Sequence, residues 1–346
     1  MKYFFLIFLL LISFALPVAA TDISPPEVPI SGEKYMPEDT ESFAEGLWYV
    51  IKSSLHALQP SIAEASGVCL SLVAVVILVS VVSSISGSSK TVLDLVSTLL
   101  IGIILTQPAN SLIRLGTETV TEMTEYGKLL LPVMTTALAA QGAPSTSAAL
   151  YTATSFFSTI LSTAVARLII PMLYIFLVLC IANSALGEDL LAQLKKFIKW
   201  SMTWGMKILL YVFTGFLGVT GVVSGSADAA AVKAAKLAIS GVVPVVGNII
   251  SDASETILVS ISAVKNAVGI YGILALCSVF VAPFMQIGCQ YLMLKLTAAV
   301  CDIFGCKKAS GLVHDFAGGM GLILGMTGMV CLFLLISTVC FMKGVS

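Results

Sequence analysis

Residues 239–269, ISGVVPVVGNIISDASETILVSISAVKNAVG, divide the chain into two apolar regions. The stretch combines Pro244 with glycines, two carboxylates and a lysine, and long apolar segments flank it on both sides. Proline interrupts helices, and charged groups near hydrocarbon are costly unless they face a partner, a cavity or the interface. The sequence therefore predicts a polar break between two membrane-embedded regions, and this break is a candidate functional segment.

The composition on either side of this break is that of a membrane protein. Of the 346 residues, 58% are hydrophobic and only 11% are charged, and the mean hydropathy is +1.03. Such a chain has too little polar surface to cover a soluble globule. The net charge of -1 gives no reason to expect nucleic-acid binding. We therefore predict an all-α, polytopic integral membrane protein with additional amphipathic interfacial helices.

The apolar segments predict about six membrane-spanning helices, with about eight as the alternative count. The first two form a helical hairpin, whose second helix we expect to stop at Pro108. The region from Leu129 to Leu186 exceeds one crossing and should hold two or three helices. The predicted apolar segments are Val68 to Ser84, Val92 to Thr106, Leu129 to Leu186, Ile208 to Val223, Ala267 to Val300 and Phe316 to Met342.

The N-terminus has the pattern of a secretory signal peptide over residues 1–20. Lys2 precedes an apolar core, and small residues lead to a cleavage site after Ala20. The alternative is a retained anchor helix, although the apolar core is shorter than a full span. In either case the chain from Thr21 begins outside the cytoplasm. Residues 21–64 form an exposed acidic leader, in which Phe43 to Leu58 has the spacing of an amphipathic helix.

Lysine clusters set the predicted orientation of the membrane regions. From Gly187 to Trp204, leucines and aromatic residues share one helical face, and Lys195, Lys196 and Lys199 share the other. This pattern predicts an interfacial helix on the cytoplasmic side. The resulting division is a first membrane region over 65–223, the break over 224–266 and a C-terminal membrane region over 267–346. A polar linker from Asp302 to Asp315 should also be cytoplasmic.

Two interpretations of the central break remain open. A helix over Asp228 to Ser240 should end at Gly241 and Pro244, and a new helix should begin near Ser251. In one interpretation the break dips into the membrane, and its carboxylates line a polar path as in transporters with discontinuous helices. In the other, which we favour, the segment is a surface helix-turn-helix whose acidic side chains are solvated near a helix N-terminus.

Nothing in the sequence indicates an enzyme. His56 and His314 lie in no nucleophile motif, and no glycine-rich loop ends in Gly-Lys-Ser/Thr. Cys301 and Cys306 have a spacing close to that of metal ligands, but no second pair completes a site. We therefore expect no catalytic residues, no cofactor and no metal.

The run PVVGNIISDASETIL at Pro244 to Leu258, continuing through Lys265, Asn266 and Gly272, closely resembles the signature of the stage III sporulation protein AE family. The resemblance extends over nearly the whole mature chain. Further matching positions are Leu131–Pro132, Ile170–Pro171, the linker Leu190 to Trp200, the glycine-rich Thr214 to Gly221, and Tyr291 to Val300.

The resemblance implies a role in endospore formation, in the mother-cell membrane facing the forespore. It implies membership of a channel assembly, with other stage III sporulation A proteins and a forespore membrane protein as partners. Two hypotheses follow: a membrane scaffold or export-apparatus-like core of that channel, or a stand-alone secondary transporter for a small solute or ion. The residues of the candidate functional segment are Pro244, Gly247, Asp252, Glu255, Lys265 and Asn266.

Overall fold

The computed structural model describes residues 24–37, 42–85, 90–242 and 247–343, and it places side chains in these ranges except at 83–91, 218–265 and 343. The signal peptide predicted for residues 1–20 lies outside this part. The described residues contain helices and no strand, which confirms the prediction of an all-α membrane protein.

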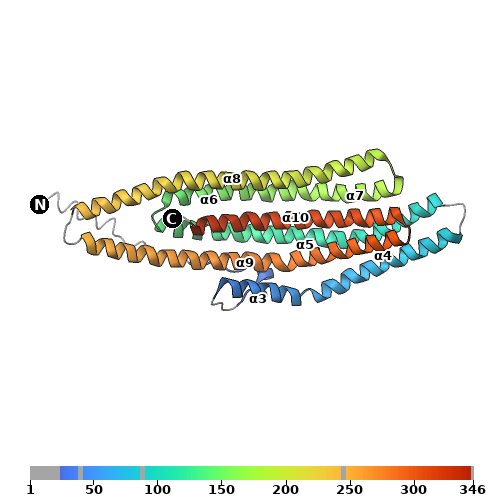
Figure 1. Ribbon diagram of the computed structural model, residues 1–346, viewed down its shortest axis with the longest axis horizontal. Coiled ribbons are helices and arrows are strands. Elements are labelled where there is room, and N and C mark those ends of the chain that lie inside the picture. The colour runs from blue at the N-terminus through green and yellow to red at the C-terminus, as the bar shows by residue number, and fades with distance from the viewer. Residues whose placement is uncertain (1–23, 38–41, 86–89, 243–246, 344–346) are drawn as a thin grey trace.

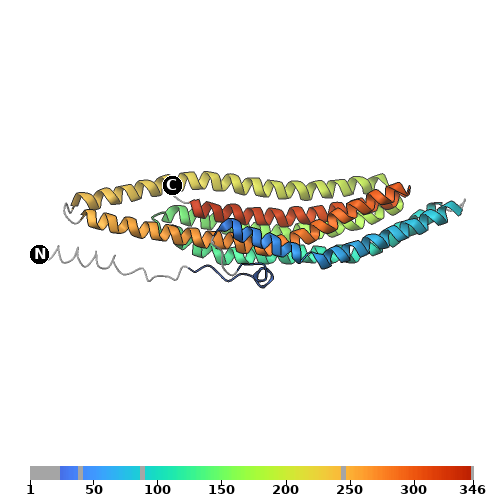
Figure 2. The ribbon, with the colours of Figure 1, turned by 60° about the horizontal axis from the view of Figure 1, so that its bottom comes forward.

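The helices form an elongated bundle in which long segments run side by side (Figure 1). Figure 2 shows the same bundle from a second direction, with the N-terminal helices along one side. The last helix, α10, packs against α9, α5, α7 and α8. The elements are α2 (Ile30–Glu33), α3 (Phe43–His56), α4 (Gln59–Ile85), α5 (Lys90–Ala140), α6 (Pro144–Ala164), the π-helix η1 (Val165–Ile169), α7 (Ile170–Leu186), α8 (Asp189–Val242), α9 (Gly247–Ile303) and α10 (Lys307–Lys343).

Helix α5 corrects the prediction that the second span stops at Pro108. The predicted hairpin is present as α4 and α5, but α5 continues for 51 residues and contains both Pro108 and Pro132. Proline removes one backbone hydrogen bond, and packing against neighbouring helices can compensate for that loss. Ala109, directly after Pro108, and Ile113, just over one turn later, are buried in the core. Tertiary packing therefore holds the helix through a residue that would end an isolated one.

The region from Leu129 to Leu186 contains the end of α5, then α6, η1 and α7, as the count of two or three helices predicted. A turn with Gly142 at a φ of 89° separates α5 from α6. A π-helical turn joins α6 to α7 just before Pro171. Proline cannot donate the usual backbone hydrogen bond, and a π-helical turn is one way to accommodate that defect.

Helices α8 and α9 are longer than the sequence suggested. The interfacial helix expected over Gly187 to Trp204 is not separate, because α8 runs without a break from Asp189 to Val242. Helix α9 passes through Pro283 as one helix, although a division into two short spans was an alternative. The linker expected over Asp302 to Asp315 is shorter than predicted, since α10 already begins at Lys307.

Apolar side chains on the surface mark one part of the bundle as the membrane-facing region. On α5 the exposed large apolar residues extend from Val92 to Ile103, and the next is Leu129. The residues exposed between these two groups are mostly polar, including Arg114, Glu118 and Glu125. Exposed apolar residues also cover α4 from Leu70 to Val82, α7 from Tyr174 to Leu186 and α8 from Leu190 to Phe216.

Five segments of the described residues are long and apolar enough to cross a membrane: Gln59–Val82, Val92–Ala140, Pro144–Leu186, Asn266–Ile303 and Lys307–Met342. Helix α8 also runs along the bundle, but its side chains after Leu217 are not described. The predicted count of about six crossings includes α8 and stays a prediction.

The leader folds back onto the bundle instead of extending away from it. Helices α2 and α3 both pack on α9, and Val50 of α3 is completely buried. The Ser31 hydroxyl donates a hydrogen bond to the Glu122 carboxylate of α5. The amphipathic helix predicted from Phe43 onward is therefore confirmed, and one of its faces lies against the chain's own membrane bundle.

Candidate functional site

The predicted signature segment forms the junction between α8 and α9. Helix α8 includes Gly241 and ends at Val242, and α9 begins at Gly247, a turn earlier than the expected start at Ser251. Pro244 lies in residues 243–246, outside the described part. Figure 1 shows the α8–α9 hairpin projecting past the end of α10. The two long helices thus carry the signature to one extreme end of the molecule.

Contacts along α9 show how far the hairpin extends. A Cβ atom added at Gly269 would meet the Met342 side chain, so this position lies level with the end of α10. The part of α9 that precedes Gly269 corresponds to about 33 Å of helix at 1.5 Å per residue. The hairpin therefore reaches well beyond the last helix of the bundle.

The candidate residues of the signature lie along this projecting helix. Asp252 and Glu255 lie in the first turns of α9, three residues apart and so on one helical face, and Lys265 follows later in the same helix. The side chains of these three residues are outside the described part, so the choice between a polar path and solvated acids stays a prediction. Asn266 is described, and its side chain is exposed.

The lysines near the start of α8 have different environments. Lys195 Nζ lies 2.5 Å from Asp315 Oδ2 of α10, and both side chains are mostly buried. Lys196 and Lys199 are exposed. Phe197, Trp200 and Trp204 are also exposed on α8, with ring centroids 6.1 and 6.2 Å apart along the series. The exposed aromatic face is the side of α8 that can meet lipid.

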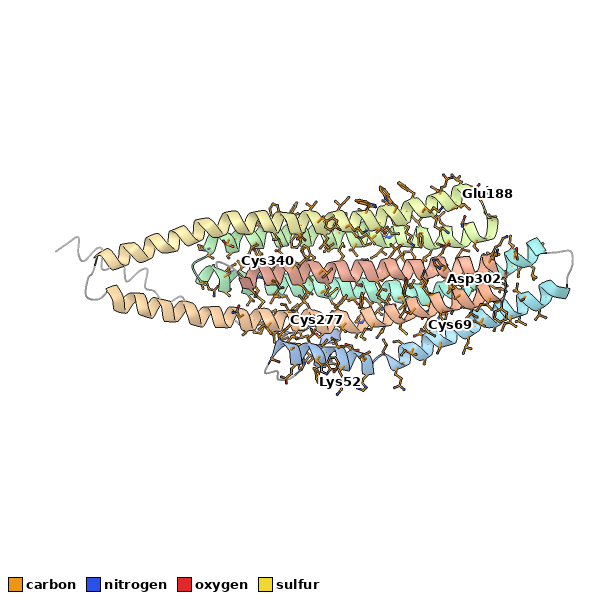
Figure 3. All side chains as sticks on the ribbon, in the orientation of Figure 1. Lys52, Cys69, Glu188, Cys277, Asp302 and Cys340 are labelled. Carbon is orange, nitrogen blue, oxygen red and sulfur yellow. The ribbon has the colours of Figure 1, made fainter. Side chains whose placement is uncertain are left out.

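Three helix connections meet at one end of the bundle, and charged groups from different helices come together there. Lys308 Nζ of α10 lies 3.5 Å from Asp94 Oδ2 of α5. The Ser184 hydroxyl of α7 donates to the Lys308 carbonyl oxygen at 3.0 Å. Figure 3 shows Glu188 and Asp302 at this same end, whereas Cys340 lies toward the other.

Sequence reasoning did not predict this cluster of charged residues. Asp94, Lys307 and Lys308 belong to segments that are far apart in the chain, and each has only an ordinary interfacial position in the sequence. The available signal was that each charge lies at the end of an apolar stretch. Only the packing of α5, α7 and α10 against one another shows that these ends coincide.

A cavity of about 130 Å³ with both polar and apolar lining lies between α4, α5 and α9. Gln290 of α9 is buried there, and its Nε2 atom has no hydrogen-bond partner in the described part of the protein. Buried amide groups are usually paired with protein or ordered water. The polar residues that line the cavity are Ser61, Glu64, Ser111, Gln286 and Gln290. The cavity could therefore accept a small polar molecule.

The described residues provide no evident centre for covalent or metal chemistry. Among them, no group of three or more His, Cys, Asp or Glu side chains is placed to hold a metal ion. Cys301 is buried in the core next to the α9–α10 turn. The Nε2 atom of His314 lies 3.0 Å from Lys295 Nζ.

The comparisons with known proteins connect this fold to sporulation. The sequence model of the family described as stage III sporulation protein AE matches residues 35–344. A protein of Bacillus subtilis (strain 168) with the name stage III sporulation protein AE is 23% identical over 193 residues. That match covers 56% of this chain and 48% of the relative, so the chain spans about half of the relative's length. No solved structure matches. Because the family model covers almost the whole described bundle, the chain belongs to the stage III sporulation protein AE family.

Proposed function

We propose that this protein acts as a membrane scaffold, or export-apparatus-like core, of a channel assembly between the mother cell and the forespore during endospore formation. Family membership supports a role in sporulation. The observation that supports the scaffold role is the α8–α9 hairpin, which carries the signature residues beyond the end of α10. An element that projects from a membrane bundle is well placed to contact other proteins.

The proposed partners are other stage III sporulation A proteins and a membrane protein of the forespore. The proposed location is the mother-cell membrane. On the orientation given by the lysines, the hairpin extends into the space between the two membranes. Ring-forming partners would meet Asp252 and Glu255 there, and a cytoplasmic ATPase would act at the opposite end of the bundle. The same orientation places the N-terminus of the mature chain outside the cytoplasm.

The central experiment replaces both signature carboxylates in the full chain, as Asp252→Asn together with Glu255→Gln. We expect fewer heat-resistant spores and less co-purification of the other stage III sporulation A proteins, with an unchanged amount of protein in the membrane. The matched control is Glu118→Gln with Glu125→Gln, because these acidic residues are exposed on α5, away from the hairpin. Unchanged co-purification in the signature variant would contradict a partner contact at these residues.

A second candidate function is a stand-alone transporter for a small polar solute, and the cavity around Gln290 is the observation that favours it. Purified protein in liposomes separates the two functions. Solute flux without partner proteins, abolished by Gln290→Leu, would support the transporter. No flux in liposomes, together with co-purification of the ring-forming partners from sporulating cells, would support the scaffold.

A further inference from the structure

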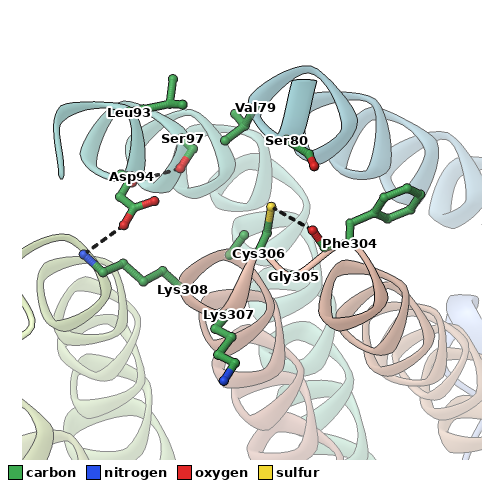
Figure 4. Close-up of a pocket in the computed structure, with 11 residues that line it drawn as sticks. Val79, Ser80, Leu93, Asp94, Ser97, Phe304, Gly305, Cys306, Lys307 and Lys308 are labelled. Carbon is green, nitrogen blue, oxygen red and sulfur yellow. Dashed lines mark hydrogen bonds and ion pairs between the residues drawn. The ribbon is translucent and has the colours of Figure 1, made fainter. Parts of the chain in front are cut away.

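A cavity of about 320 Å³ opens at the end of the bundle where three helix connections meet. Its walls come from the end of α4, the start of α5 and the turn between α9 and α10, as Figure 4 shows. It is larger than the cavity around Gln290. Its volume falls in the range of sites for small organic ligands.

The charged groups in this cavity give it an excess of positive charge. Lys307 and Lys308 both line it, and Asp94 is the acidic residue in its lining. In Figure 4 the Lys308 side chain points toward Asp94, and the Lys307 side chain points away from both. Lys307 has no acidic partner within 4 Å among the described residues. The first turn of α10 also begins here, and the backbone amides of a helix N-terminus add positive potential. An anion is therefore the favoured occupant.

The ion pair between Lys308 and Asp94 does not close the cavity to an anion. The Nζ and Oδ2 atoms are 3.5 Å apart, and each side chain is 46% exposed. Exposed pairs of this kind contribute little to stability because water and salt screen them. A phosphate group can therefore take the place of the Asp94 carboxylate as the partner of Lys308.

One wall of the cavity is apolar and continues into the membrane-facing surface. Val79, Leu93 and Phe304 contribute this wall. Val82 and Val92 lie nearby on α4 and α5 and are exposed on the outside of the bundle. An occupant with a phosphate group at the lysines could thus extend hydrocarbon chains along α4 and α5 into the bilayer.

We propose that this cavity binds a phosphate-bearing anion and that its occupant is the headgroup of an anionic phospholipid. Lys308 binds the phosphate, and the exposed Lys307 side chain turns toward it from the outward position drawn in Figure 4. Val79, Leu93 and Phe304 contact the start of the acyl chains. Basic pockets between membrane helices bind such headgroups elsewhere. The proposal does not depend on the role in the channel assembly, because it concerns the opposite end of the bundle from the hairpin.

The test is native mass spectrometry of the full chain purified in detergent and titrated with phosphatidylglycerol or phosphatidylcholine. We expect a bound phosphatidylglycerol at concentrations where phosphatidylcholine does not bind. Lys307→Gln and Lys308→Gln should each weaken phosphatidylglycerol binding about fivefold, the effect expected for one lysine near an anionic headgroup. Asp94→Asn should strengthen it, because the competing carboxylate is removed.

Two controls distinguish this site from bulk charge and from a site for soluble phosphate. Lys196→Gln removes an exposed lysine outside the cavity and should change binding less than twofold, which marks bulk charge as the smaller effect. Glycerol phosphate supplies the headgroup without acyl chains. Binding of glycerol phosphate as tight as that of phosphatidylglycerol would overturn the lipid assignment and leave a phosphate site.

The proposal as a whole fails on either of two results. One is equal binding of phosphatidylglycerol and phosphatidylcholine. The other is that Lys307→Gln and Lys308→Gln change phosphatidylglycerol binding no more than the Lys196→Gln control does. The direction of the Asp94→Asn effect separates loss of a binding group from loss of folding, since a misfolded variant cannot bind the lipid more tightly.

Discussion

Gly32 is a residue at which the leader packs tightly against the bundle. A Cβ atom at this position would lie 2.5 Å from Ser278 Oγ and 2.8 Å from Val279 Cγ2, both in α9. The Val279 backbone nitrogen is also near, at 3.1 Å, and a backbone atom cannot rotate away as the end of a long side chain can. The contact therefore requires glycine.

Gly32→Ala should loosen the leader at a cost of about 1–3 kcal/mol, the usual range for overpacking. Limited proteolysis in detergent should then cut the leader faster than in the unmodified protein. Gly67→Ala is the control, because a Cβ atom there has open space within helix α4. Equal cleavage rates for the Gly32→Ala variant and the unmodified protein would show that the leader is not held by this contact.

Cys306 offers a probe of the charged end of the bundle. Burial raises the pKa of its thiol, and the nearby Asp94 carboxylate raises this pKa further. A raised pKa leaves less thiolate at a given pH, and the thiolate is the reactive form. Cys306 should therefore be alkylated more slowly than a model thiol near pH 8, and its rate should continue to rise above that pH.

Asp94→Asn should speed the alkylation of Cys306, because removal of the negative charge lowers the thiol pKa. Mass spectrometry of the modified peptide measures this rate, and Cys306→Ser identifies the signal. Glu118→Gln removes a distant carboxylate on the same helix and should leave the rate unchanged. A rate that is independent of Asp94 would contradict the electrostatic coupling.

At the scale of elements, the ion pair between Lys195 and Asp315 joins α8 to α10. Its 2.5 Å distance and partial burial make it a charge-assisted hydrogen bond with limited access to water. Lys195→Met should destabilise the bundle by about 1–3 kcal/mol, because it leaves a mostly buried carboxylate without its partner. The measurement is the apparent melting temperature in detergent.

The exchange Lys195→Asp with Asp315→Lys should recover part of that loss. Lys196→Met, at a neighbouring exposed position, should leave the melting temperature unchanged. A melting temperature in Lys195→Met equal to that of the unmodified protein would mean that the pair does not hold α8 to α10.

Several elements could be predicted from the sequence, and the failures have a common cause. The hairpin of α4 and α5 and the separation of α8 from α9 follow from apolar runs and from glycine and proline between them. The predicted stop at Pro108 was wrong because propensity rules describe an isolated helix, whereas α5 is supported by neighbours on several sides. The charged cluster around Asp94 needed the packing of distant helices, which no local pattern encodes.

At the scale of the whole molecule, the end of α4, the start of α5 and the connections after α7 and α9 lie at one end of the bundle, and the α5–α6 connection lies at the other (Figure 1). Cysteines placed at Glu188 and Lys307 should therefore be labelled from the same side of the membrane by a reagent that cannot cross it. On the proposed orientation this is the cytoplasmic side. A cysteine at Gln141 should be labelled from the opposite side.

The measurement is the labelling of each cysteine variant minus the labelling of the unmodified protein, which carries only the native cysteines. Labelling of positions 188 and 307 from opposite sides would contradict the bundle itself. Labelling of both from outside would preserve the bundle and reverse its orientation, including the direction in which the α8–α9 hairpin points.

The position of α10 has a consequence for synthesis of the protein. It is the last described helix to leave the ribosome, yet it packs against α5, α7, α8 and α9. Gly116 and Gly127 of α5 lie against Ile323 and Leu334 of α10, so this close-fitting face of α5 has no occupant until α10 has been synthesised. The helices that precede α10 therefore enter the membrane before the surface that joins them is present, and the insertion of α10 completes their packing.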